Sequence, residues 1–79
     1  MTWHYAAGCK VDDLGDPFWG VYEVYDGADD DTETLFTERH MRPSGETRLE
    51  LVDDLARMLK DVCYFPAIDA DAEEYTELK

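Results

Sequence analysis

The stretch "FWGVYEVY", residues 18–25, decides the fold because it is apolar on both of its alternating faces. Its large side chains fall into two sets, Trp19, Val21 and Tyr25 on one face and Phe18, Tyr22 and Val24 on the other. A strand of this kind has no side suited to water. The pattern therefore predicts a central strand that needs cover on both faces.

The flanking residues predict two more strands. Residues 2–11 alternate with a period of two, and the turn-forming stretch "DDLGDP", residues 12–17, separates them from the central strand. After it, Asp26 and Gly27 open a hairpin-like connection, and "TETLFTERHM", residues 32–41, predicts a returning strand. We therefore expect a three-stranded antiparallel meander over residues 2–41.

Residues 47–63 predict one amphipathic helix. Thr47 and Glu50 have the spacing of a capping box, so the helix should begin at Arg48. Apolar residues at helical spacing form a stripe made of Leu51, Val52, Leu55, Met58, Leu59 and Val62. We expect this stripe to pack on one face of the sheet, which gives an α+β fold of the order β-β-β-α.

Pro66 ends the helix, and residues 66–79 form an acidic C-terminal segment that predicts either a short acidic helix or a loose tail. The 79 residues fit a single domain spanning 1–79. One helix cannot cover two apolar sheet faces. The second face should therefore meet the C-terminal segment, a partner, or a second copy of the chain in a homodimer.

The charge balance limits the partners that the chain can bind. It has 20 Asp and Glu against 7 Lys and Arg, a formal net charge of -13. Nucleic acid and anionic membranes would repel such a chain, so a basic protein partner is favoured. Cys9 and Cys63 lack the spacing of a metal or redox pair, and we expect two reduced, partly buried thiols.

Enzymatic and metal-binding functions find little support. His4 and His40 have no nucleophile elbow beside them, so we predict no catalysis and no cofactor. The acidic stretch starting at Asp29 has carboxylates at calcium-loop spacing. However, its sixth position is Thr34 instead of Gly and its twelfth is His40 instead of Glu, so we predict no metal site.

The carboxylates gather in clusters with little compensation along the chain. Asp53 and Arg57 have the spacing of a favourable helical pair, whereas Glu50 and Asp54 form a like-charge pair. Ten or so uncompensated carboxylates on a small domain approach the density of duplex DNA, about one charge per 1.7 Å. The predicted partner-binding residues are Asp12, Asp13, Asp16, Asp26, Asp29, Asp30, Asp31, Glu33, Glu50, Asp53 and Asp54.

Two alternatives explain the same acidity differently. The cytosolic protein of a halophile would also be rich in Asp and poor in Lys, with the charge serving as an adaptation to salt. The stretch "SGETRLELVDDLARMLKDV" resembles the helix that follows the strands in HicB-like antitoxins. That resemblance implies a small regulatory protein-interaction module.

A longer resemblance covers residues 3–59. The segments "WHYAAGCKVDDLGDPFWGVYEVYDG" and "FTERHMRPSGETRLELVDDLARML" resemble short acidic proteins of bacteria and prophages. As a class, such proteins are similar to anti-CRISPR inhibitors that mimic DNA. The resemblance implies a non-catalytic inhibitor that blocks a basic groove of a host defence complex, with a Cas effector subunit as partner. No signal peptide or apolar run of membrane length is present, so we expect a cytoplasmic location, in the host cell if phage-encoded.

Overall fold

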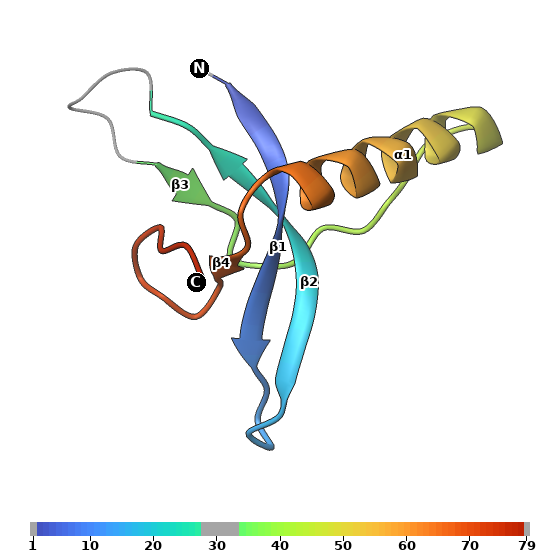
Figure 1. Ribbon diagram of the computed structural model, residues 1–79. Coiled ribbons are helices and arrows are strands. Elements are labelled where there is room, and N and C mark those ends of the chain that lie inside the picture. The colour runs from blue at the N-terminus through green and yellow to red at the C-terminus, as the bar shows by residue number, and fades with distance from the viewer. Residues whose placement is uncertain (1, 28–33, 79) are drawn as a thin grey trace.

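The computed structural model describes residues 2–27 and 34–78. One helix accompanies a curled four-stranded sheet, so the α+β prediction is confirmed (Figure 1). The elements are β1 (Trp3–Val11), β2 (Pro17–Tyr25), β3 (Leu35–Phe36), α1 (Arg48–Tyr64) and β4 (Ile68–Asp69). The sheet order is β3-β2-β1-β4, and β4 runs parallel to β1. The prediction of a three-stranded, purely antiparallel sheet was therefore wrong in that the sheet has a fourth strand, β4, which is parallel to its neighbour.

The β1–β2 hairpin matches the alternating sequence pattern. Its register runs from Trp3 opposite Tyr25 to Val11 opposite Pro17 without interruption. Cross-strand partners share a face, so the pairs of Ala6 with Tyr22 and of His4 with Val24 lie on the same side of the sheet. The central strand therefore presents its Tyr22 and Val24 face to the core.

The third strand is much shorter than residues 32–41. After Phe36, the Glu23 amide donates to the side-chain hydroxyl of Thr37 (3.2 Å) instead of to a backbone carbonyl. The chain then bends, and pairing with β2 returns only as a single bridge between Met41 and Val21. The Thr37 hydroxyl takes the place of a backbone carbonyl as acceptor for the Glu23 amide, and the regular pairing of β2 with β3 ends there.

The C-terminal segment is part of the core and is neither a helix nor a loose tail. Ile68 and Ala70 are buried against Ala6, Tyr22 and Val24, with Tyr75 packed beside them. The segment folds back on itself, since the Asp69 amide donates to Thr76 (2.8 Å) and the Leu78 amide to Ala67 (2.8 Å). It covers the Tyr22 and Val24 face of the sheet. The sequence analysis had named this segment as one of three possible covers for a sheet face.

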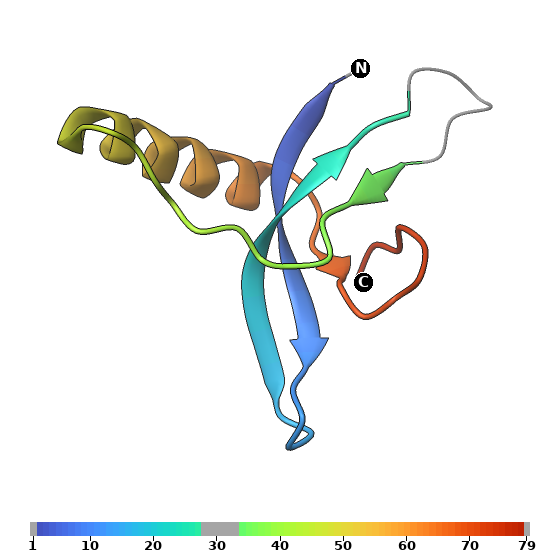
Figure 2. The same ribbon diagram turned by 180° about the vertical axis from the view of Figure 1, so that it is seen from behind.

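The helix begins as predicted and packs differently. Thr47 caps it, with the Glu50 amide donating to the Thr47 hydroxyl (3.1 Å) and the Thr47 amide to the Glu50 carboxylate (3.1 Å). Only Met58 is buried among the helix residues, whereas Val52 is 49% and Leu59 68% exposed. The prediction that the apolar stripe is covered was therefore wrong for Val52, Leu55 and Leu59, whereas its member Met58 is buried and Leu51 and Val62 are half-buried. Figures 1 and 2 show why: the last turns of α1 cross β1 while its first turns extend past the sheet.

Carboxylates close the outer edge of β1. The Tyr5 amide, which points away from β2, donates to the Asp61 carboxylate of α1 (3.1 Å). Further along the same edge, β4 pairs with Gly8 and Cys9, and the Val11 amide donates to the Asp71 carboxylate (2.7 Å). Edge amides left without partners would invite pairing with other chains. The polar side of α1 faces β1 because Asp61 provides an acceptor there.

We predict that Asp61→Ala destabilises the fold through this edge. The Tyr5 amide is part-buried and would lose its acceptor, which costs about 1–3 kcal/mol in the free energy of unfolding. Urea denaturation followed by tryptophan fluorescence measures the change. Asp13→Ala, an exposed carboxylate in the β1–β2 turn, is the control and should change stability by less than about 0.5 kcal/mol. Equal effects of the two substitutions would contradict the edge role.

A second prediction concerns Gly8, which lies beneath the Tyr22 ring. A Cβ at this position would meet Tyr22 ring carbon Cδ2 at 2.5 Å and Cβ of Ala70 at 3.3 Å. Gly8→Ala should therefore cost about 1–3 kcal/mol by overpacking. In a Tyr22→Leu background the ring is absent, and the same substitution should cost clearly less. A double-mutant cycle by urea denaturation tests this, and strict additivity would contradict the clash.

Candidate functional site

The predicted acidic residues divide into three groups in the structure. Asp29, Asp30, Asp31 and Glu33 lie outside the described residues. Four others accept hydrogen bonds that hold the fold: Asp12, Asp26, Glu50 and Asp54. The last three, Asp13, Asp16 and Asp53, are exposed, and their own carboxylates accept no hydrogen bond from another described residue.

The four engaged carboxylates each satisfy local donors. Asp12 accepts from the Leu14 and Asp16 amides (both 2.9 Å) and so shapes the β1–β2 turn. Asp54 accepts from the Tyr5 hydroxyl (2.9 Å) and from the Ser44 amide (2.9 Å). The clusters are therefore not simply uncompensated charge, because backbone amides and hydroxyls compensate part of them. The contacts of Asp26 and Asp54 join residues distant in the sequence and come from the fold, whereas the Glu50 contact was already predicted as a capping box.

The predicted pair of Asp53 with Arg57 was wrong. Arg57 lies 3.8 Å from Asp61 and places its guanidinium carbon 3.9 Å from the centre of the Trp3 ring. Stacking on a half-exposed indole, together with a carboxylate one turn further along the helix, holds Arg57 against β1. Asp53 is left facing solvent.

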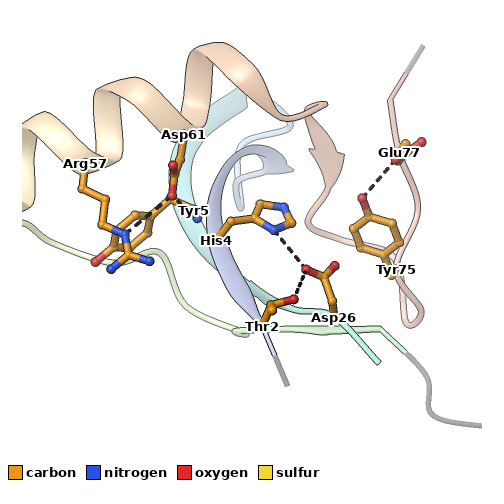
Figure 3. Close-up of polar contacts among 8 residues, drawn as sticks. All are labelled: Thr2, His4, Tyr5, Asp26, Arg57, Asp61, Tyr75 and Glu77. Atoms are coloured by element: carbon orange, nitrogen blue, oxygen red, sulfur yellow. Dashed lines mark hydrogen bonds and ion pairs between the residues drawn. The ribbon is translucent and has the colours of Figure 1, made fainter. Parts of the chain in front are cut away.

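Figure 3 shows a second polar cluster, at the start of β1. The Asp26 carboxylate accepts from the Thr2 hydroxyl (3.1 Å) and lies 3.5 Å from His4 Nδ1. The His4 ring is buried and stacks on Phe65 with a centroid distance of 3.7 Å. These contacts tie the end of β2 and the end of α1 to β1, so Asp26 has a structural role.

The unengaged acids do not gather on one surface. Asp13 and Asp16 lie in the β1–β2 turn, at the far end of the hairpin from the first turns of α1, which carry Asp53 (Figure 1). The sequence clusters therefore map to separate extremities of the molecule. The described residues of the predicted set therefore do not form one continuous acidic face.

The most distinctive acidic feature is a projecting hairpin arm, which we define as residues 11–19. Its turn is fixed by Gly15 at φ 85° and by the Gly15 amide donating to Asp12 O (3.0 Å). Asp13 and Asp16 lie at its tip, and Trp19, 57% exposed, lies on its shaft together with exposed Val11 and Phe18. Aromatic and acidic side chains together form a surface suited to a basic protein partner.

Sequence reasoning missed a basic hollow on the opposite side of this arm. Its volume is about 480 Å³, and its charged lining is Lys10, Arg39 and Arg42 with the acidic Asp12 and Glu38, beside Phe18 and His40. The basic residues outnumber the acidic ones by three to two. The His40 ring packs 5.2 Å from the Phe18 ring, and Gly20 leaves room for it, since a Cβ there would meet His40 Cβ at 2.8 Å. The only sequence signal was the local run "ERHMR", residues 38–42, in a chain poor in basic residues.

A larger hollow, about 800 Å³, lies between β3 and the C-terminal segment. Its charged lining is mainly acidic and includes Glu38, Asp71, Glu73 and Glu74, with Lys10 at its margin. Within residues 2–27 and 34–78, no group of three or more His, Cys, Asp or Glu side chains is placed to hold a metal ion. Both thiols are free, and Cys63 is exposed, contrary to the expectation of partial burial.

Two tyrosines have strongly raised pKa values. Burial raises the pKa of Tyr5 to about 12, helped by its hydrogen bond to the negative Asp54 carboxylate. Burial likewise raises the pKa of Tyr75 to about 12, helped by the hydrogen bond to Glu77 (3.1 Å) that Figure 3 draws. Both hydroxyls thus act as donors that hold the fold together, Tyr5 at α1 and Tyr75 in the C-terminal segment.

These pKa values predict alkaline unfolding. The folded chain retains the two phenolic protons above pH 10.0, the ordinary value, whereas the unfolded chain releases them. The free energy of unfolding should therefore be at its full value below pH 10 and fall as pH rises from 10 towards 12. Urea denaturation at several pH values measures the fall. Tyr5→Phe and Tyr75→Phe should each flatten it, and an unchanged slope in the double variant would contradict the assignment.

No family model, curated protein or solved structure matches the chain. No helix within the described residues combines the length and the apolar character needed to cross a membrane. The case for function therefore rests on the hairpin arm, the charge distribution and the exposed apolar surfaces of the molecule itself.

Proposed function

We propose that the protein is a non-catalytic acidic inhibitor that binds a basic, nucleic-acid-binding groove of a host defence complex, of the anti-CRISPR type. The observation that carries the proposal is the hairpin arm, with Asp13 and Asp16 at its tip and Trp19 exposed on its shaft. The net charge of -13 supports it, since long-range attraction to a basic groove would speed association.

The arm combines charge with a source of affinity. Exposed carboxylates on their own contribute little at physiological salt, because each is well solvated and screened. Trp19 provides a large apolar surface and a π-face on which a Lys or Arg of the partner can stack. A basic groove that normally holds phosphates has such cations in abundance. The tip carboxylates would then take the place of phosphates.

The position of the basic hollow indicates which side of the arm would face the proposed partner. Lys10, Arg39 and Arg42 would be repelled by a basic groove, so the side of the arm that carries them should face away from the partner. The Trp19 side and the tip should face towards it. This arrangement narrows the proposal from a general acidic surface to one protruding element.

Competition with duplex DNA for a Cas complex tests the proposal. A labelled target duplex is bound to a purified, guide-loaded Cas effector, and its displacement by this protein is followed by fluorescence anisotropy. Wild type should displace the duplex, and Asp13→Lys/Asp16→Lys should weaken displacement at least about tenfold, as should Trp19→Ala. The weakening should diminish for the charge variant as salt rises.

Glu73→Lys/Glu74→Lys is the matched control, because it makes the same change in net charge within the C-terminal segment, away from the arm. Its displacement should fall by less than about threefold. Equal losses in the two double variants would show that only total charge matters. Absence of displacement from representatives of the main Cas effector types would overturn the anti-CRISPR proposal. Loss of folding below molar salt would instead favour the halophile explanation.

A further inference from the structure

One apolar side of α1 is left uncovered by the described residues 2–27 and 34–78. The helix turns the side that carries Asp54, Met58 and Asp61 towards β1. At about 100° per residue, the uncovered side lies roughly opposite on the helix. On that side five residues repeat with alternating steps of three and four, and from here the stripe means these five: Leu49, Val52, Ala56, Leu59 and Cys63. Only Val52 and Leu59 belong to the stripe predicted from the sequence. All five are exposed, Leu49 to 72%.

This spacing is the a and d pattern of a helix that packs against another helix. In that notation Leu49, Ala56 and Cys63 occupy a positions, and Val52 and Leu59 occupy d positions. A stripe of this length over a whole helix is more apolar surface than an isolated monomer commonly leaves in water. Burial of a Leu or Val side chain contributes about 1.5–3 kcal/mol, so covering the stripe is strongly favoured.

We propose that a second copy of this chain covers the stripe from Val52 to Cys63, through antiparallel pairing of the two α1 helices about a two-fold axis. The helix is a part of the molecule where two such acidic chains can meet with little repulsion. It carries three basic and four acidic residues, a formal charge of -1, in a chain of -13. A two-fold interface also needs a self-complementary surface, and the margins of the stripe provide one.

Charge complementarity selects the register of the pair. Asp53 and Lys60 lie on the same margin of the stripe, two helical turns apart. When Val52 faces Cys63 of the other copy and Ala56 faces Leu59, Asp53 comes to lie beside the other copy's Lys60. A shift by one heptad instead places the two Asp53 carboxylates together, which like charge disfavours. The opposite margin pairs Leu55 with Val62, both apolar.

The antiparallel direction follows from size and charge. It sets the small Ala56 against Leu59, whereas a parallel pair would set Ala56 against Ala56 and leave a void. It also sends the two sheets to opposite ends of the paired helices, because the first turns of α1 extend past the sheet (Figure 1). The two acidic bodies are thus kept apart, which lowers their mutual repulsion.

Sedimentation over a range of concentrations tests the dimer. Wild type should sediment as a dimer at about 100 micromolar, and added salt should strengthen association because it screens the net repulsion between copies. Leu59→Glu should weaken association at least about tenfold, since two charges would enter the interface. Leu14→Glu, the same change on the exposed hairpin turn, should leave it unchanged. A wild type that stays monomeric under all these conditions overturns the proposal.

Charge exchange and cross-linking test the register. Asp53→Lys and Lys60→Asp should each weaken the dimer, and the double variant should restore it. Under oxidation, Val52→Cys should cross-link through native Cys63, whereas Leu49→Cys should not, because it faces the end of the other helix. Cross-linking of wild type through Cys63 alone would indicate a parallel pair and contradict the antiparallel arrangement. Failure of the double variant to restore association would overturn the register.

The two proposals fail separately. Salt should strengthen the dimer and weaken displacement of DNA from a basic groove, so one set of salt titrations distinguishes them. Leu59→Glu changes only the helix, and the arm variants change only the hairpin. A monomeric protein that still displaces DNA would leave the proposed function in place.

Discussion

The outer edge of β1 is the constraint on which the rest of the structure depends. One edge of β1 pairs along its full length with β2, and the other must be satisfied by residues far away in the sequence. Asp61 accepts from Tyr5, β4 pairs with Gly8 and Cys9, and Asp71 accepts from Val11. These contacts place α1 beside β1 and bring the C-terminal segment over the Tyr22 and Val24 face. Most of the tertiary structure therefore follows from closing a single edge.

The same constraint changes the meaning of the acidity. Asp61 and Asp71 are acceptors for strand amides, Glu50 caps the helix, and Asp54 holds a buried hydroxyl. A carboxylate that accepts two or three hydrogen bonds is stabilised locally whatever the net charge of the chain. The described carboxylates of the predicted set that accept no such hydrogen bond, Asp13, Asp16 and Asp53, lie at the extremities, and the proposed function uses the two at the hairpin tip. Net charge alone would have overstated the size of the binding surface.

Local features of the fold could be predicted from the sequence, and distant ones could not. The β1–β2 hairpin and the capping box of Thr47 and Glu50 depend on neighbours within a few residues, and they appear where the pattern indicates. β4 has only two residues, and its pairing with β1 spans some sixty positions, so no periodicity could reveal it. The basic hollow was missed for the same reason, because Lys10 and residues 39–42 meet only in the folded chain.

The orientation of α1 differs from the sequence prediction, and the reason for the difference is informative. An amphipathic stripe normally faces the core of its own domain, and that rule predicted the wrong side of the helix. On the side of the helix that faces β1, Met58 is buried and Asp61 accepts from the part-buried Tyr5 amide, a contact whose loss would cost about 1–3 kcal/mol. Once that contact fixes the rotation of the helix, Leu49, Val52 and Leu59 must face outward. A conflict between the local sequence pattern and the fold is characteristic of sites that have a function in addition to folding. For this helix, the apolar stripe and the matched charges of Asp53 and Lys60 on its margin indicate that this additional function is pairing with another copy of the same helix.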